Sequence, residues 1–202
     1  MSERLLLATL LAERAHRHQT RQSDGCPYLI HPLRVAQLVA EHLPADWPEG
    51  EDVVIAAVLH DTLEDTTLSA EQITAQLGPR VTALVEEVTN PSLGKVDKKR
   101  WQVEHATTLS RGACLIKMAD KLDNLRDHLQ TPIWGLRRTQ GYLLHAREVV
   151  DRMPHSSPAL RAALDQIWAE GVIRAADGEG PALDPHLTLE EWYADLQPAG
   201  QR

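Results

Sequence analysis

Apolar residues recur along this chain at the three- and four-residue spacing of an α-helix, and no stretch alternates convincingly as a strand would. Pro32 is typical of a first helical position, Ser69 with Gln72 forms a capping box, and Gly78-Pro79 ends one helix and begins the next. The pattern predicts an all-α protein, a helical bundle in a single domain. Helices are expected at residues 3–19, 32–43, 51–64, 70–77, 80–89, 97–108, 112–129, 133–152 and 158–170.

The C-terminal quarter differs from the rest in composition. Residues 171–187 are rich in Gly, Pro and Asp, which predicts a linker. Thr188 and Glu191 then form a capping box for a last short helix that carries Trp192 and Tyr193. We therefore expect a main domain at residues 1–155 and a helical extension at 156–202, which is too short for a further domain.

Composition and charge narrow the class of protein. The 202 residues are 43% hydrophobic and 25% charged, as in soluble globular domains, and no apolar run approaches the length of a membrane span. A net charge of -8 disfavours binding to nucleic acid, and membrane association is not expected. Cys26 and Cys114 lack the spacing of a metal or disulfide motif, which fits the reducing cytoplasm.

A small anionic partner remains compatible with this acidic chain. Residues 95–100 hold a local cluster of positive charge, which acts over about 10 Å at physiological salt. Its members are Lys95, Lys98, Lys99 and Arg100. The net charge therefore does not exclude a small anionic substrate.

His60 and Asp61 are the residues most indicative of chemistry. They end the apolar run at residues 53–59, and Glu64 and Asp65 follow at helical spacing, so that His60 faces Glu64 and Asp61 faces Asp65. An imidazole beside a carboxylate at the end of a buried helix is unfavourable unless a cation, usually a divalent metal, binds both. The second acidic pair could handle the proton of a metal-activated water. This pattern predicts a metalloenzyme.

The remaining ligands must come from distant parts of the chain. His31 lies at a predicted helix N-terminus, and Asp120 shares one face of its helix with Asn124 and Asp127. Periodicity alone also fits a solvated acidic face for Asp120 and an ordinary capping or core histidine for His31. Spacing alone does not join these two residues to His60 and Asp61.

Three motifs together resemble the Rel/Spo-type alarmone hydrolase domain and its small stand-alone members, within the HD superfamily of metal-dependent phosphohydrolases. They are HRHQTRQSDGCPYLIHP at 16–32, HDTLEDT at 60–66 and IKMADKLDNLR at 116–126. With the EEVT sequence at 86–89, the resemblance covers about residues 1–152 and implies an all-helical HD fold.

The resemblance also implies a set of site residues. One divalent ion, usually Mn²⁺, would be held by His31, His60, Asp61 and Asp120, and this mixed donor set also allows Fe, Co or Zn. Glu64 and Asp65 match the acidic pair that positions and deprotonates the attacking water in that family.

Substrate residues follow from the same resemblance. Arg21 matches an arginine that packs on the nucleobase, and Asn124 matches an asparagine near the ribose. Lys95, Arg138 and Tyr142 resemble residues that hold phosphates, and Arg138 and Tyr142 lie one helical turn apart. For these three, a surface charge or an aromatic at the edge of the core fits equally well.

The chain departs from the family pattern at three points. His18 stands where a glycine is common, one extra residue separates Arg21 from Pro27, and Asp123 stands where an aromatic or histidine often lies near the nucleotide. At that last position a carboxylate would add negative charge beside a polyanionic substrate. These departures bear on the identity of the substrate more than on metal binding.

We therefore expect a metal-dependent (p)ppGpp 3′-pyrophosphohydrolase that yields GDP or GTP and pyrophosphate. The same chemistry on an adenosine alarmone, on the 2′-phosphate of NADPH or on a simple nucleotide is the nearest alternative. A non-catalytic nucleotide sensor would not need Glu64 and Asp65. A cyclic-di-nucleotide phosphodiesterase of the HD type is disfavoured because further histidine motifs for a second metal are missing.

Overall fold

The computed structural model describes residues 2–130, 135–177, 184 and 186–197, and within these ranges it contains helices and no strand. This confirms the all-α prediction. A single isolated backbone bridge joins Thr20 to Pro27 in the loop after the first helix. The helices are α1 Glu3–His16, α2 Ile30–His42, α3 Gly50–Leu59, α4 Thr62–Asp65, α5 Ala70–Leu77, α6 Pro79–Val88, α7 Lys95–His105, the short 3₁₀ helix η1 Ala106–Thr108, α8 Arg111–Gln130, α9 Leu136–Arg152, α10 Pro158–Asp177 and α11 Leu189–Asp195.

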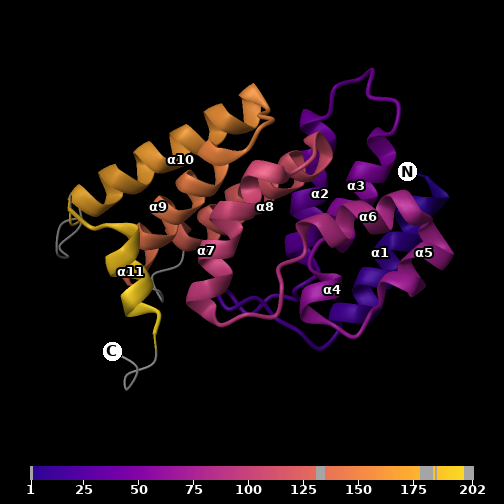
Figure 1. Ribbon diagram of the computed structural model, residues 1–202, viewed down its shortest axis with the longest axis horizontal. Helices are drawn as coiled ribbons and strands as arrows, with labels where there is room; N and C mark the ends of the chain where they lie inside the picture. The colour runs from indigo at the N-terminus through magenta and orange to yellow at the C-terminus, as the bar shows by residue number, and fades with distance from the viewer. Residues whose placement is uncertain (1, 131–134, 178–183, 185, 198–202) are drawn as a thin grey trace.

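The helices form two groups on either side of α8 (Figure 1). In the N-terminal group, α3 packs against α1, α2 and α6, and α2 also packs against α8. In the C-terminal group, α9 and α10 pack against α8, and α11 packs against α9. Helix α8 therefore connects both halves of the core.

Burial of the apolar runs explains where the polar site residues lie. Ile55, Ala56, Ala57 and Leu59 of α3 are fully buried, so the helix carries the following residue, His60, into the interior. Most of α8 is also buried, including the polar Asp120 and Asp123. Both helices thus bring charged side chains into the core, where they need partners.

The predicted helix at 51–64 is interrupted, which corrects the sequence interpretation. Helix α3 ends at Leu59 and α4 begins at Thr62. Between them, the backbone of Asp61 (φ -99°, ψ -5°) departs from the angles of a regular α-helix. The Thr62 hydroxyl donates a hydrogen bond to the Leu59 carbonyl at 2.7 Å and so competes with the regular helix pattern. His60 and Asp61 therefore lie at a junction, and not within a continuous helix as predicted.

One other boundary differs from prediction at the C-terminal side. The linker expected at 171–187 begins later, because α10 continues through Asp177; the Ala and Arg residues at 174–176 are good helix formers. Residues 178–183 and 185 of that predicted linker, and the predicted start of the 133–152 helix, lie outside the described residues. The last short helix is confirmed, with the predicted capping box between Thr188 and Glu191.

Within the described part of the chain, no helix combines the length and the apolar character that crossing a bilayer requires.

Candidate metal centre

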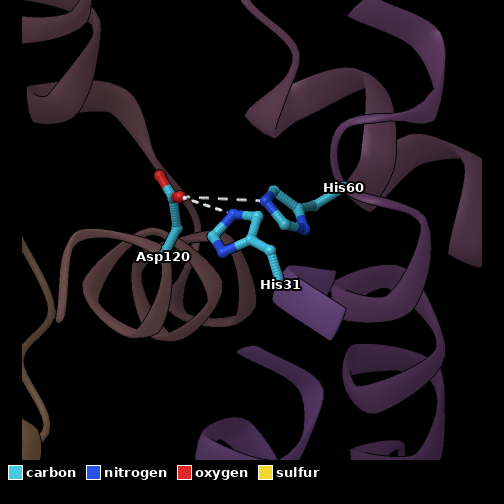
Figure 2. A group of neighbouring side chains, drawn as sticks. All are labelled: His31, His60 and Asp120. Atoms are coloured by element: carbon cyan, nitrogen blue, oxygen red, sulfur yellow. Dashed lines mark ion pairs between the residues drawn. The ribbon is translucent and has the colours of Figure 1, made fainter. Parts of the chain in front are cut away.

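Four side chains from three separate parts of the sequence meet where α2, the α3–α4 junction and α8 come together. Donor atoms of His31, His60 and Asp120 all lie within 4.8 Å of one another (Figure 2). The Asp61 Oδ2 atom lies 3.0 Å from His60 Nε2 and 3.5 Å from His31 Nε2. The structure thus brings together the four residues that the sequence nominated as ligands.

Hydrogen bonds to the far side of each ring determine which histidine nitrogen faces this cluster. His60 Nδ1 lies 2.8 Å from the Ala57 carbonyl oxygen, and His31 Nδ1 lies 2.7 Å from Asp123 Oδ2. Both partners are acceptors, so each Nδ1 carries the proton and each Nε2 of a neutral ring presents a lone pair. His60 Nε2 is buried and makes no hydrogen bond with any described residue. Two nitrogen lone pairs are therefore directed toward the same point.

The electrostatic field at this point favours a cation. Burial lowers the pKa of His60, but the negative charges of Asp61 and Asp120 outweigh it and raise the pKa to about 10. Burial likewise opposes a charge on His31, whose pKa is nevertheless raised by Asp120 and Asp123. Although burial disfavours their ionisation, both carboxylates keep lowered pKa values because the histidines stabilise the anions. A proton or a metal ion satisfies this field, and the two compete for the same nitrogens.

Neutral side chains fix the two carboxylates. The Tyr28 hydroxyl donates a 2.7 Å hydrogen bond to Asp61 Oδ2, and the Asn124 amide donates a 2.6 Å hydrogen bond to Asp120 Oδ1. Burial and the nearby Asp61 charge raise the pKa of Tyr28, so its hydroxyl stays protonated and remains a donor. These contacts orient both acids toward the histidines.

The two acids Glu64 and Asp65 differ in their contacts with neighbouring side chains. Glu64 accepts hydrogen bonds from Lys98 Nζ at 2.7 Å and from the Asn90 amide at 2.6 Å. The Asp65 side chain has no hydrogen bond or ion pair with any described residue. Burial, together with the charges of Asp61 and Glu64, raises the pKa of Asp65 to about 6. Asp65 is thus the better suited of the two to accept a proton near neutral pH.

A cavity of about 670 Å³ is lined by residues of α7, α8, α9 and α11. Lys98 connects it to the acidic pair, since it lines the cavity and binds Glu64. Burial and the neighbouring charge of Lys121 lower the pKa of Lys99 to about 7. The polar and aromatic residues that line the cavity are Lys95, Lys98, Lys99, His128, Arg137, Arg138, Tyr142, Trp192 and Asp195. This composition suits a polyanion with a flat or apolar group.

The predicted substrate residues fall into two groups. Lys95, Arg138 and Tyr142 line the cavity together. Arg21 and Asn124 instead bind each other at 3.0 Å, and Arg21 also forms a 2.6 Å ion pair with Asp127. Arg21 is therefore held by an acid of α8, and stacking on a base would have to coexist with that ion pair.

Sequence reasoning missed several partners in this site. Tyr28 lies within the first motif, and Lys98 lies within the positive cluster, but neither pattern indicates a contact with Asp61 or Glu64. Asp123, which the resemblance placed near the nucleotide, also has a partner that the sequence did not indicate. Its carboxylate is buried against His31 because α8 packs on α2.

Comparisons with known proteins agree with this geometry. The family model described as "HD domain" matches residues 8–140. The chain is 40% identical over 172 residues to guanosine-3′,5′-bis(diphosphate) 3′-pyrophosphohydrolase MESH1 of Mus musculus, covering 82% of this chain and 93% of the mouse protein. The protein of the same name from Drosophila melanogaster is 41% identical over 160 residues, covering 77% of this chain and 87% of the fly protein.

A solved structure shows the same fold. It is described as "A metazoan ortholog of SpoT hydrolyzes ppGpp and plays a role in starvation responses", and it superposes with a TM-score of 0.78 at 37% identity. The match covers 84% of this chain and 96% of that one. The motifs, the cluster at the α3–α4 junction and these matches establish that the chain belongs to the HD domain family.

Proposed function

We propose that this protein is a metal-dependent (p)ppGpp 3′-pyrophosphohydrolase. It hydrolyses guanosine tetraphosphate to GDP and pyrophosphate, and guanosine pentaphosphate to GTP and pyrophosphate. The observation that carries the proposal is the convergence of two histidine lone pairs and two carboxylates beside a cationic cavity. The relatives that bear this activity in their names, at about 40% identity, support the choice of substrate.

The metal-binding part of the proposal assigns His31, His60, Asp61 and Asp120 as ligands of one Mn²⁺ ion. Two imidazole nitrogens and two carboxylate oxygens are donors that Mn²⁺ accepts, and the buried lone pair of His60 fits such an ion. A divalent ion at this position supplies a Lewis acid that lowers the pKa of water and polarises a phosphate oxygen.

The chain's own groups perform the proton transfer and the positioning. Asp65 accepts the proton of the attacking water, because its pKa of about 6 leaves it ionised at neutral pH and still basic enough to act. Glu64, held by Lys98 and Asn90, orients that water toward the 3′-phosphorus. Pyrophosphate then leaves with the bond to the ribose 3′-oxygen broken, and the 3′-oxygen takes up a proton.

The cavity provides the substrate contacts in this proposal. Lys95 and Arg138 bind phosphate oxygens, and Tyr142 contacts the nucleotide beside them. We assign the base and the ribose to Arg21 and Asn124, which bind each other and, through the Asn124 amide, Asp120. The two unpaired cysteines are consistent with action in the cytoplasm.

A nucleotide panel assayed with Mn²⁺ tests the proposal. Guanosine tetraphosphate, an adenosine alarmone, NADPH and simple nucleotides are incubated separately, and phosphate and pyrophosphate are quantified as distinct products. We expect pyrophosphate and GDP from guanosine tetraphosphate, with the highest kcat/KM of the panel. Preferred release of single phosphate from NADPH would instead establish the alternative substrate, and tight binding without turnover would establish a sensor.

A further inference from the structure

Asp123 is a buried acid that contacts a histidine of another helix. It lies on α8, its residue is 2% exposed, and its Oδ2 atom lies 2.7 Å from Nδ1 of His31 on α2. A carboxylate is costly to bury, and this one is compensated by the ring N–H that points at it. The contact therefore couples α8 to the orientation of the His31 ring.

The geometry has a direct consequence for the opposite ring nitrogen. A carboxylate accepts only from an N–H, so it holds the proton of His31 on Nδ1 and leaves the Nε2 lone pair for the cluster. Nε2 lies 3.4 Å from Asp120 Oδ1 and 3.5 Å from Asp61 Oδ2, which places it at the centre of the candidate metal centre. A carboxylate behind a ligating histidine fixes the ring and makes its free nitrogen more basic.

His60 provides an internal comparison. Its Nδ1 donates to the main-chain carbonyl of Ala57, a neutral acceptor within its own helix. Because a main-chain carbonyl is the acceptor, no side-chain substitution removes it. The orientation of His31 depends instead on a single side chain, that of Asp123 on another helix, which a mutation can remove. The two histidines are thus oriented by acceptors of different charge.

We propose that Asp123 is a positioning residue of the metal centre, which orients His31 and strengthens its bond to the divalent ion. This inference rests on the metal-binding part of the proposed function and is independent of which nucleotide is hydrolysed. It gives a role to a side chain that the sequence comparison placed beside the substrate.

Metal affinity of the full-length protein tests the inference without any substrate. Protein stripped of metal is titrated with Mn²⁺ by calorimetry, for the parent, Asp123→Asn and Asp123→Ala. We expect Asp123→Ala to bind Mn²⁺ about 10- to 100-fold more weakly, as is typical when such a partner is removed. Asp123→Asn keeps an oxygen acceptor but loses the charge, so its affinity is expected between those of the parent and the alanine variant.

Asp127→Asn is the matched control. Asp127 lies on the same helix, is also buried and binds Arg21 instead of a ligand histidine. We expect its Mn²⁺ affinity to equal that of the parent. Nitrogen-15 NMR of the histidine rings, recorded on metal-free protein at a pH where the His31 ring is neutral, adds a second readout. In the parent, His31 should show the Nδ1-protonated tautomer, and in Asp123→Ala it should show a mixture of the two tautomers.

Two results would overturn the inference. One is a folded Asp123→Ala or Asp123→Asn variant that binds Mn²⁺ as tightly as the parent. The other is an equal loss of affinity in Asp127→Asn, which would indicate general disturbance of α8. If the alanine variant does not fold, as judged by circular dichroism, the near-isosteric Asp123→Asn variant decides the question alone. Failure of the nucleotide assay leaves these affinities unaffected, so the two proposals fail separately.

Discussion

The raised pKa of Asp65 predicts an acid limb in the pH–rate profile. A general base must be ionised, so activity falls as the pH falls through the pKa of this carboxyl group. With a pKa of about 6, about 90% of Asp65 is ionised near pH 7 and about 10% near pH 5, which lowers kcat/KM up to about tenfold. An ordinary aspartate, with a pKa of about 3.9, would lose less than about 10% over the same range.

The causes of the raised Asp65 pKa predict how mutations of its neighbours should move the acid limb. Burial is its largest cause, followed by the charges of Asp61 and Glu64, while Lys98 opposes it. A cation bound at Asp61 offsets part of that charge, which moves the midpoint of the acid limb to lower pH. Glu64→Gln should move the limb to lower pH, and Lys98→Met should move it to higher pH.

The assay is kcat/KM for guanosine tetraphosphate from about pH 4.5 to 8 at saturating Mn²⁺, with bound metal measured at each pH because protons compete for the histidines. Asp65→Asn, which cannot accept the proton, should retain metal and lose turnover. A profile that is flat from about pH 7 to 4.5, or an Asp65→Asn variant with the same acid limb and the parent rate, would refute the reasoning.

Three further predictions concern the ligands, the cavity and the C-terminal helix. Asp61→Ala should lose both bound metal and turnover, whereas Glu64→Ala should keep its metal and lose turnover. Elemental analysis combined with the pyrophosphate assay distinguishes the two variants. Hydrolysis by Glu64→Ala at the parent rate would contradict the assignment. Arg138→Ala should raise KM about 10-fold or more with unchanged metal content, because a hydrogen bond to a charged group contributes about 1.5–3 kcal/mol; an unchanged KM would place the phosphates elsewhere. Gly141→Ala should reduce the free energy of unfolding by about 1–3 kcal/mol, because a Cβ atom there would clash with the Trp192 ring of α11. In the matched control, Gly94→Ala, the Cβ atom would meet only Asp97 Oδ2 at 3.7 Å, an ordinary contact, so equal denaturant midpoints of the two variants would contradict this packing.

Local chemistry made the helices predictable from the sequence. The capping boxes of α5 and α11 and the helix boundary at Gly78-Pro79 involve neighbouring residues, and the structure agrees with all three. The run that ends at His60-Asp61 indicated a histidine and an acid at the end of a buried helix, and the structure buries His60 and half-buries Asp61. The junction between α3 and α4 was missed because a threonine hydroxyl bonding to a nearby carbonyl leaves little trace in a periodic pattern.

The candidate ligands illustrate what the sequence by itself determined. His60 and Asp61 are adjacent and could be recognised from composition and burial, whereas His31 and Asp120 were joined to them only by resemblance to a family. The four side chains converge because α2 and α8 pack against each other and because α3 ends next to the cluster that they form.

Only the tertiary structure decided how the site is supported. Asp123 and His31 are 92 positions apart, Glu64 and Lys98 are 34 apart, and Tyr28 and Asp61 are 33 apart. Periodicity assigns a residue to a face of its own helix, but it does not tell which residue of another helix lies opposite. The physical reason is that helix packing, set by the whole apolar core, fixes these distances, and a buried charge is stabilised only by the partner that the packing brings within hydrogen-bonding distance.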